Sequence, residues 1–263
     1  MSRYHQVALR TRDAPISVPE ALDCQTRSCA DCPFRKAGHL CGTLFEGEEQ
    51  PAAENLQTGP SWLSRSHEVA RRRRTIYRND DTSNSVAIIC EGWACVYIPL
   101  PDGERQILTF LLPGDITSAA AVFQDHSGVS VEAVTDLRYC MIDKTELKLL
   151  LANNQKVFEE FSRIWAGRKG EVERLATDLG HKSAEQRIAR LIMGLMERHE
   201  MRNLVEAGRF AFPLRQQHIA DATGLTVVHV NRVIGIMRKL GLIEIEGRTL
   251  TVRDLSELRR FAN

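Results

Sequence analysis

One stretch near the C-terminus restricts the folds open to this chain more than any other. Residues 212–240 contain two short helical patterns separated by Gly224, with Thr226 placed to begin the second helix and Gly241 placed to end it. Residues 243–252 then alternate apolar and polar side chains about a Glu-Gly turn, as a β-hairpin does. The pattern predicts a helix-turn-helix with a β-hairpin wing, a motif typical of DNA-binding domains; a helical hairpin that binds no DNA is the alternative. The residues that would pack the two helices together are Ile219, Ala220, Leu225, Val230, Val233 and Ile234.

A longer helical stretch precedes this motif and carries large side chains at alternating steps of three and four. Such a stripe is typical of a helix that pairs with another helix along a seam. We therefore expect a self-partner, although an amphipathic helix lying on its own domain gives a similar stripe. Arg168 interrupts the seam, and a charge there is costly unless it is paired or exposed. The stripe, predicted as a dimer interface, consists of Phe158, Phe161, Trp165, Arg168, Val172, Leu175 and Leu179.

Residues 69–139 show a different pattern, in which short apolar runs are separated by turn signals. Runs at this spacing predict an antiparallel β-sandwich or roll. A run of arginines, Arg71–Arg74, stands at its start, and we interpret it as a solvated strand edge rather than a binding patch. The turn signals, rich in Asn, Asp, Gly and Pro, fall at 79–81, 91–92, 101–103 and 113–115.

The N-terminal part of the chain is rich in cysteine. Four of the seven cysteines follow the spacing C-x4-C-x2-C-x8-C, which predicts a disulfide frame, a metal site or a redox switch. Residues 1–20 contain no apolar signal segment, and no apolar run could span a membrane, so we expect a cytoplasmic protein. Stable disulfides are rare in the cytoplasm, which favours a metal site or a redox switch. The clustered cysteines are Cys24, Cys29, Cys32 and Cys41.

The overall composition, with 43% apolar and 26% charged residues, is that of an ordinary globular protein. The formal net charge of +1 neither favours nor excludes a nucleic-acid partner. The chain contains no P-loop, dinucleotide-binding fingerprint or nucleophile elbow, and we predict that it is not an enzyme. The predicted parts are a flexible tail at 1–22, a cysteine-rich segment at 23–60, a β-roll at 61–155, a dimerisation helix at 156–181 and a helix-turn-helix domain at 182–263.

Several short motifs occur in order between residues 65 and 255, on either side of the long helix. They are Glu91-Gly92, Pro101–Ile107, Leu112–Ile116, Ser183–Ala189, and Gly224-Leu-Thr-Val followed by Asn231-Arg232. Together they resemble the CRP/FNR superfamily of bacterial transcription regulators. The resemblance implies an α+β fold with an antiparallel β-roll sensor domain of the cyclic-nucleotide-binding type, a long dimerisation helix and a C-terminal winged helix-turn-helix. It also implies a homodimer that binds a palindromic operator in double-stranded DNA and contacts RNA polymerase.

The cysteine cluster is similar to that of the oxygen-sensing FNR branch of this superfamily. In that branch, three N-terminal cysteines and one at the end of the roll hold a [4Fe–4S] cluster, and Cys140 stands at the matching place here. The resemblance implies Cys29, Cys32, Cys41 and Cys140 as ligands, with Cys24 as the alternative. Four thiolates are the usual ligands of such a cluster. The interval between Cys32 and Cys41 is longer than in that branch, which a longer loop accommodates.

Other chemistries remain open. The four clustered cysteines could bind zinc among themselves or act as a thiol–disulfide switch. A cyclic-nucleotide-responsive regulator is disfavoured because no arginine stands beside Ser127-Gly128 to pair with a cyclic phosphate. Cys90 and Cys95 are interpreted as buried, inert thiols. A haem sensor of the same superfamily is a further alternative, with iron ligands drawn from His67, His126 and Cys90.

The resemblance also assigns DNA contacts to the second helix of the helix-turn-helix. Arg232 matches the family's guanine-reading arginine, and Asn231 can pair with adenine. Val228 stands where the family has a glutamate that accepts from cytosine, with His229 beside it. We therefore predict a half-site different from the standard FNR one. The candidate phosphate contacts, which position without specifying sequence, are Thr226, Arg215 and Arg238.

Under this hypothesis, oxygen or nitric oxide attacks the cluster and the dimer relaxes. The acidic residue that opposes dimerisation in the FNR branch corresponds to Val172 here, and Arg168 is the charged seam residue instead. A permanent dimer with altered orientation is therefore the alternative to monomer–dimer switching. The sequence does not decide among oxygen, nitric oxide and peroxide as the signal, nor between activation and repression.

Overall fold

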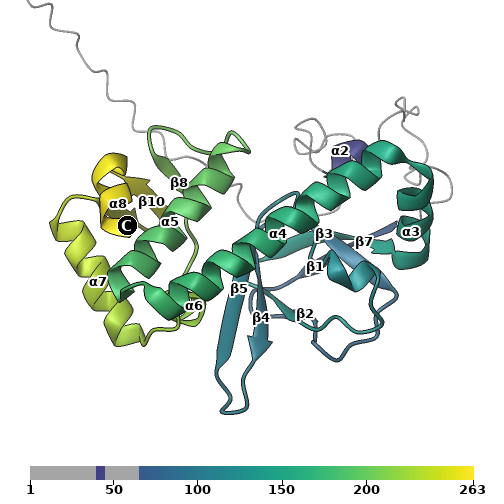
Figure 1. Ribbon diagram of the computed structural model, residues 1–263, viewed down its shortest axis with the longest axis horizontal. Helices are drawn as coiled ribbons and strands as arrows, with labels where there is room; N and C mark the ends of the chain where they lie inside the picture. The colour runs from purple at the N-terminus through teal and green to yellow at the C-terminus, as the bar shows by residue number, and fades with distance from the viewer. Residues whose placement is uncertain (1–39, 45–64) are drawn as a thin grey trace, which may run out of the picture.

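The computed structural model describes residues 40–44 and 65–263 (Figure 1). Cys24, Cys29 and Cys32 lie outside the described residues. The N-terminal roll is built from strands whose pairings are all antiparallel. These strands are β1 (Arg65–Ala70), β2 (Thr75–Tyr77), β3 (Ser85–Glu91), β4 (Ala94–Pro99), β5 (Arg105–Leu111), β6 (Ser130–Ala133) and β7 (Leu137–Asp143).

Two sheets make up the roll. One has the strand order β1-β7-β3 and the other β2-β6-β4-β5. Side chains from both sheets, such as Ala87, Leu111 and Tyr139, form a buried cluster. Ile88 and Cys140 belong to a second cluster, with residues of the covering helices, because side chains alternate across a strand. Apolar side chains on both faces of β3 explain why residues 86–89 are buried without interruption.

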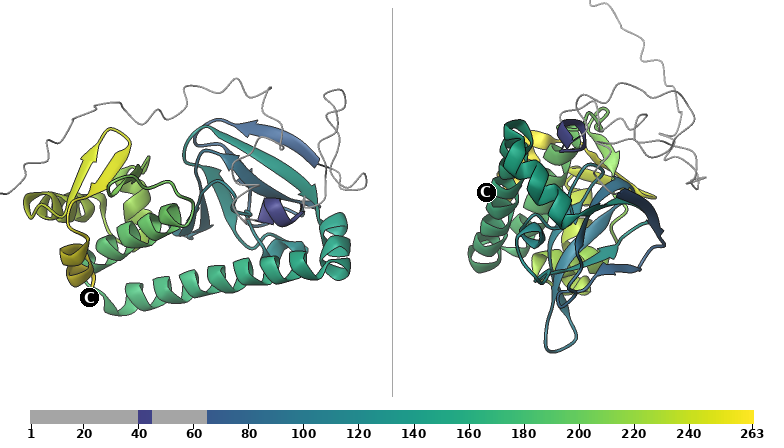
Figure 2. Two further views of the ribbon diagram at one scale, coloured as in Figure 1. Left: turned by 90° about the horizontal axis from the view of Figure 1, so that it is seen from above. Right: turned by 90° about the vertical axis from the view of Figure 1, so that its right-hand side faces the viewer.

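In the described part of the chain, a short helix, two longer ones and one 3-10 turn accompany the roll. They are α2 (Leu40–Leu44), η2 (Ala120–Val122), α3 (Lys144–Asn153) and α4 (Gln155–His181). Asp143 caps α3 by accepting from the Thr145 N–H at 2.7 Å, and Asn154 caps α4. The 27 residues of α4 span about 40 Å at 1.5 Å per residue. Figure 2 shows α4 running beneath both the roll and the C-terminal domain, with α2 between α4 and the roll.

The C-terminal domain contains the predicted winged helix-turn-helix. It consists of α5 (Ala184–Glu200), β8 (Arg209–Ala211), α6 (Gln216–Thr223), α7 (Val227–Lys239), β9 (Ile243–Glu246), β10 (Thr249–Val252) and α8 (Leu255–Ala262). Gly224 makes the turn between α6 and α7 at φ +63°, and an added Cβ there would lie 2.9 Å from Leu179 Cδ2. Thr226 Oγ1 accepts from the His229 N–H at 3.3 Å and so caps α7. The predicted fold class is confirmed. None of the described helices is long and apolar enough to cross a membrane.

Candidate nucleic-acid interface and its contacts with the roll

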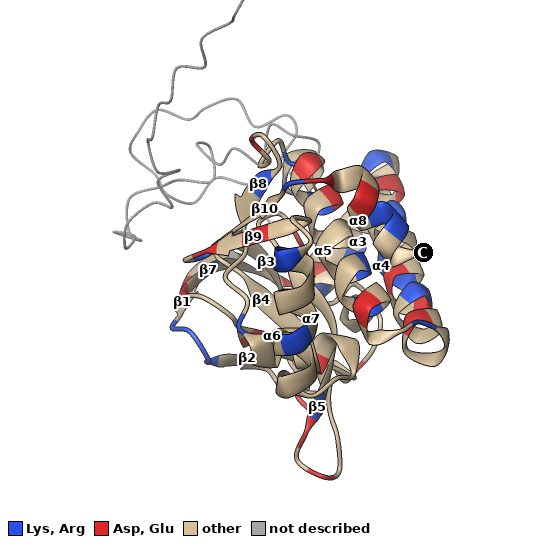
Figure 3. Cartoon of the chain, turned by 90° about the vertical axis from the view of Figure 1, so that its left-hand side faces the viewer, with Lys and Arg blue, Asp and Glu red and all other residues tan. Residues whose placement is uncertain are grey.

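Helix α7 carries the predicted base contacts on its outer side. Val228, Asn231 and Arg232 are exposed, whereas Val230 and Val233 are buried against the rest of the domain. Figure 3 shows α7 in front at the surface, and Figure 1 shows that this end of the molecule lies away from the roll. Periodic burial therefore leaves one face of the helix open to a major groove. The candidate phosphate contacts Thr226, Arg215 and Arg238 are also exposed.

The predicted seam of α4 divides into two groups. Phe158, Trp165 and Val172 are exposed, and Trp165 stacks on the exposed Phe123 of the roll with ring centroids 6.3 Å apart. Phe161 is only 2% exposed and lies in the second apolar cluster of the roll. Its assignment to the dimer interface is therefore corrected: Phe161 packs within its own chain. Leu175 and Leu179 are half-buried.

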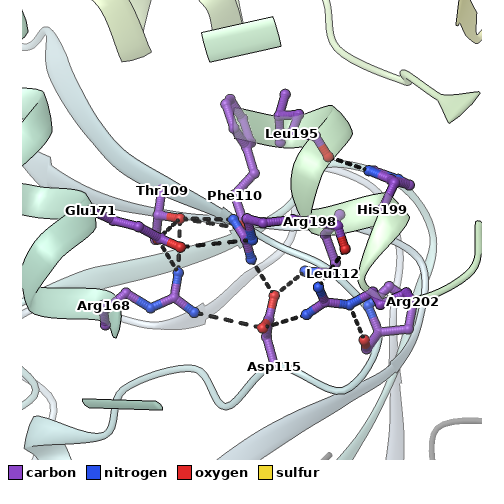
Figure 4. Close-up of polar contacts among 11 residues, drawn as sticks. Thr109, Phe110, Leu112, Asp115, Arg168, Glu171, Leu195, Arg198, His199 and Arg202 are labelled. Carbon is purple, nitrogen blue, oxygen red and sulfur yellow. Dashed lines mark hydrogen bonds and ion pairs between the residues drawn. The ribbon is translucent and has the colours of Figure 1, made fainter. Parts of the chain in front are cut away.

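Arg168 belongs to a buried polar network rather than to an open seam. The centre of this network is Asp115, in the turn after β5, whose side chain is 13% exposed (Figure 4). Its carboxylate accepts from Arg198 Nη2 at 2.5 Å and from Arg202 Nη2 at 2.9 Å, and it lies 3.8 Å from Arg168 Nη2. It also accepts from the Leu112 N–H at 2.7 Å. One carboxylate thus joins the roll to α4 and to α5 of the DNA-binding domain.

The arginines of this network have further partners. Arg198 donates to the Phe110 carbonyl at 2.7 Å, and Arg202 donates to the Pro113 carbonyl at 3.1 Å. Arg168 donates to Glu171 at 2.9 Å. Burial alone would raise the pKa of Asp115, but the arginines and the Leu112 N–H outweigh it and hold that pKa below its ordinary value. The buried Asp115 carboxylate is therefore kept in its charged form and has both cationic and hydrogen-bonding partners, as a stable buried ion pair requires.

A second polar contact joins β5 to the helix-turn-helix. Arg105 Nε donates to Asp221 of α6 at 2.7 Å, and its guanidinium also lies 3.1 Å from Glu132. Gln106 Nε2 donates to the Asp221 carbonyl at 2.9 Å. No local pattern marks Arg105 and Gln106 as functional, because Asp221 lies more than a hundred positions away from them. The local signals for the first network were the spacing of Arg198 and Arg202 by about one helical turn and the charge of Arg168 within an apolar stripe.

Cys140 lies on the central strand of its sheet, where β7 pairs it with His67 of β1 and Ile88 of β3. It is 3% exposed and shares its apolar cluster with Leu40 and Leu44 of α2, the helix that contains Cys41. The segment that carries Cys41 therefore packs on the sheet face that carries Cys140. Within residues 40–44 and 65–263 no three His, Cys, Asp or Glu side chains gather as a metal site. A site at Cys140 needs ligands from the remainder of the chain.

The other cysteines and the histidines considered as haem ligands have different environments. Burial raises the pKa of the fully buried Cys95 thiol to about 12, so that it is inert at neutral pH, as predicted. Cys90 is half-buried and packs against the same apolar cluster as Cys140. His67 is exposed on β1, whereas His126 is exposed in the loop before β6. Ser127 Oγ donates to the Val129 carbonyl at 2.7 Å.

Two buried histidines should make the stability of the protein depend on pH. Burial lowers the pKa of His199 and that of His218 to about 4, from an ordinary value of 6.5. The folded state binds a proton at each of these histidines less readily than the unfolded state does. Their contribution to the free energy of unfolding is therefore complete above about pH 6.5 and is lost as pH falls towards 4. We expect the free energy of unfolding to fall by on the order of 2–3 kcal/mol per histidine over this range. Urea denaturation at pH 7 and pH 5 measures the loss, which should be smaller in His199→Phe; an equal loss would contradict the assignment.

Comparison with known proteins agrees with this architecture. Residues 67–154 match the family model of the cyclic nucleotide-binding domain, and residues 186–261 match that of the Crp-like helix-turn-helix domain. The "Anaerobic regulatory protein" of Haemophilus influenzae is 27% identical over 230 residues, covering 88% of this chain and 86% of the relative. The "Transcriptional activator protein FnrL" of Cereibacter sphaeroides is 26% identical over 234 residues, covering 88% and 90%. The solved structure of FixK2 from Bradyrhizobium japonicum covers 76% of this chain and 98% of its own, with 26% identity and a TM-score of 0.69.

The two matched domains, their order and the long helix between them agree with the arrangement of roll, α4 and winged helix-turn-helix described above. The chain belongs to the CRP/FNR family, whose members are DNA-binding transcription regulators.

Proposed function

We propose that this chain is a homodimeric regulator whose operator binding responds to oxygen or nitric oxide through a [4Fe–4S] cluster. Its ligands would be Cys29, Cys32, Cys41 and Cys140, with Cys24 as the alternative. A cluster held there would supply a group that reacts with oxidants and whose loss frees the N-terminal segment. The regulator would act in the cytoplasm on a palindromic operator and contact RNA polymerase.

The observation that carries this proposal is the packing of α2 on the sheet face of Cys140. Leu40 is fully buried and Leu44 is 3% exposed, both in the apolar cluster that includes Cys140. The chain on either side of Cys41 is thereby held close to the face that bears the distant thiol. Soft thiolate donors in an apolar setting suit an iron–sulfur cluster. The names of two relatives, an anaerobic regulatory protein and FnrL, support a regulator that responds to oxygen.

The absorption spectrum of anaerobically purified protein tests the proposal. We expect a broad band near the edge of the visible range that bleaches when air is admitted. A sharp Soret band would instead indicate haem. A colourless protein that contains zinc would contradict both, and a thiol switch would leave a colourless, metal-free protein.

The exposed part of the α4 stripe supports dimerisation. Phe158, Trp165 and Val172 are 51%, 50% and 38% exposed, and large apolar side chains gathered in this way indicate a protein contact. Sedimentation of anaerobic and air-exposed protein separates the two modes of switching. A dimer in both states would exclude a monomer–dimer switch and leave a change of orientation within the dimer.

Replacement of Arg232 tests the DNA contact of α7. Its side chain is 62% exposed at the open face of the helix, and arginine can donate to guanine O6 and N7 together. We expect Arg232→Ala to weaken binding to the selected operator by about 1–3 kcal/mol. Fluorescence anisotropy with labelled duplexes measures the loss, and Arg259→Ala on α8 serves as the control. Unchanged affinity of Arg232→Ala would refute base reading by this residue.

A further inference from the structure

The first turn of α7 presents an apolar side chain to solvent. Val228 is 78% exposed, the largest exposed fraction of the large apolar side chains in the described residues. A single exposed valine needs no explanation by itself. Val228, however, precedes Asn231 and Arg232 by three and four residues, so all three side chains lie on one face of the helix. This is the face that a helix-turn-helix inserts into the major groove.

His229 and Arg232, which follow Val228 on α7, are engaged with each other. Arg232 Nη2 lies 2.6 Å from His229 Nε2 and 3.9 Å from Glu185 Oε1 of α5. A guanidinium has only donors, so His229 Nε2 is the acceptor in this contact. Hydrogen bonding by its own backbone N–H lowers the pKa of Glu185, with Arg232 contributing, so its carboxylate stays ionised beside Arg232. The guanidinium is thus oriented from one side by two acceptors.

Val228 can therefore contact a base only through its methyl groups. An isopropyl group can neither donate nor accept, and in the major groove only thymine offers an apolar partner, its C5 methyl. Opposite cytosine, the same side chain would strip water from an amino group without replacing its hydrogen bond. We propose that Val228 selects a thymine in each half-site by contact with the C5 methyl.

The same geometry places this thymine relative to the guanine read by Arg232. Side chains four residues apart on a helix are about 6 Å apart, and base pairs are stacked at about 3.4 Å per step. The thymine therefore lies within about two base pairs of that guanine. The inference rests on the DNA contact of α7 proposed above, and the Arg232→Ala variant separates failure of the one from failure of the other.

The test begins with selection of duplexes from a palindromic library with randomised half-sites spaced by one helical turn. The guanine whose replacement no longer matters in Arg232→Ala identifies the register. Each thymine within two base pairs is then replaced by deoxyuridine, which lacks only the methyl group. We expect this change in both half-sites to weaken binding of the unaltered protein by about tenfold, the loss of about one buried methyl contact per half-site.

Two variants make the result specific. In Val228→Ala the penalty for deoxyuridine should shrink to less than about threefold, because the γ-methyl groups are gone. In Val228→Glu the preferred base should change to cytosine, whose amino group a carboxylate accepts. Arg238→Ala, at the other end of α7, should lower affinity for both duplexes equally. Selected half-sites without a thymine in this window would overturn the proposal. So would equal binding of thymine and deoxyuridine duplexes by a protein that still loses affinity in Arg232→Ala.

Discussion

Asp115→Asn is expected to lower the free energy of unfolding by about 3 kcal/mol, because it breaks a buried ion pair from one side. The asparagine keeps the size of the side chain and one accepting oxygen. It removes the charge that faces Arg198 and Arg202, whose side chains are only 13% and 6% exposed. Two guanidinium groups would then remain in a buried site without a full counter-charge. Urea denaturation at pH 7 measures the change.

The matched control is Glu173→Gln on α4, because Glu173 pairs with Lys169 where both side chains are exposed by more than half. An exposed pair of this kind contributes less than about 1 kcal/mol. The two variants should therefore differ clearly, and equal stability would show that the network around Asp115 adds nothing to the docking of the domains. Since Asp115 joins the roll to α5, we also expect operator affinity to change in Asp115→Asn and not in Glu173→Gln.

Cys140→Ala is expected to abolish cluster assembly, whereas Cys24→Ala should leave it intact. With Cys140 removed, three thiolates would face a cluster that needs four ligands. Iron and sulfide analysis of protein purified without oxygen, together with its absorption spectrum, measures the outcome. We expect Cys140→Ala to retain little of the iron found in the unaltered protein.

Cys95→Ala is the control for general damage to the roll. Cys95 is also fully buried, but it lies in a different apolar cluster, together with Trp93 and Phe110. The Cys95→Ala variant should retain the iron–sulfur cluster even if the stability of the protein falls. The reverse result, in which Cys24→Ala destroys the cluster and Cys140→Ala spares it, would mean that the N-terminal cysteines form a local site, as a zinc site would.

The helix-turn-helix and its wing could be predicted because local chemistry specifies them. Gly224 supplies the left-handed turn, Thr226 caps α7, and Gly247 turns the wing at φ +58°. Each feature depends on a few neighbouring residues, so it can be found in one sequence. The strands of the roll were predicted for the same reason, from turn residues between short apolar runs.

The stripe on α4 could be predicted only in part. A helix seam and a helix face that lies on its own domain differ little in period, so the pattern alone did not separate Phe158 from Phe161. The structure buries Phe161 in the roll and leaves Phe158 exposed. It also pairs Arg168 with Asp115, which satisfies the requirement that a charge in such a stripe be paired or exposed.

The sequence by itself determined the β-roll, the long helix and the winged helix-turn-helix, their order along the chain, and the family to which the chain belongs. Only the tertiary structure decided which residues join the roll to the DNA-binding domain. Asp115 meets Arg198 and Arg202 across more than eighty positions, and Arg105 meets Asp221 across more than a hundred. Short-range periodicity and turn chemistry leave local signals, whereas ion pairs between distant segments are selected by the packing that brings those segments together.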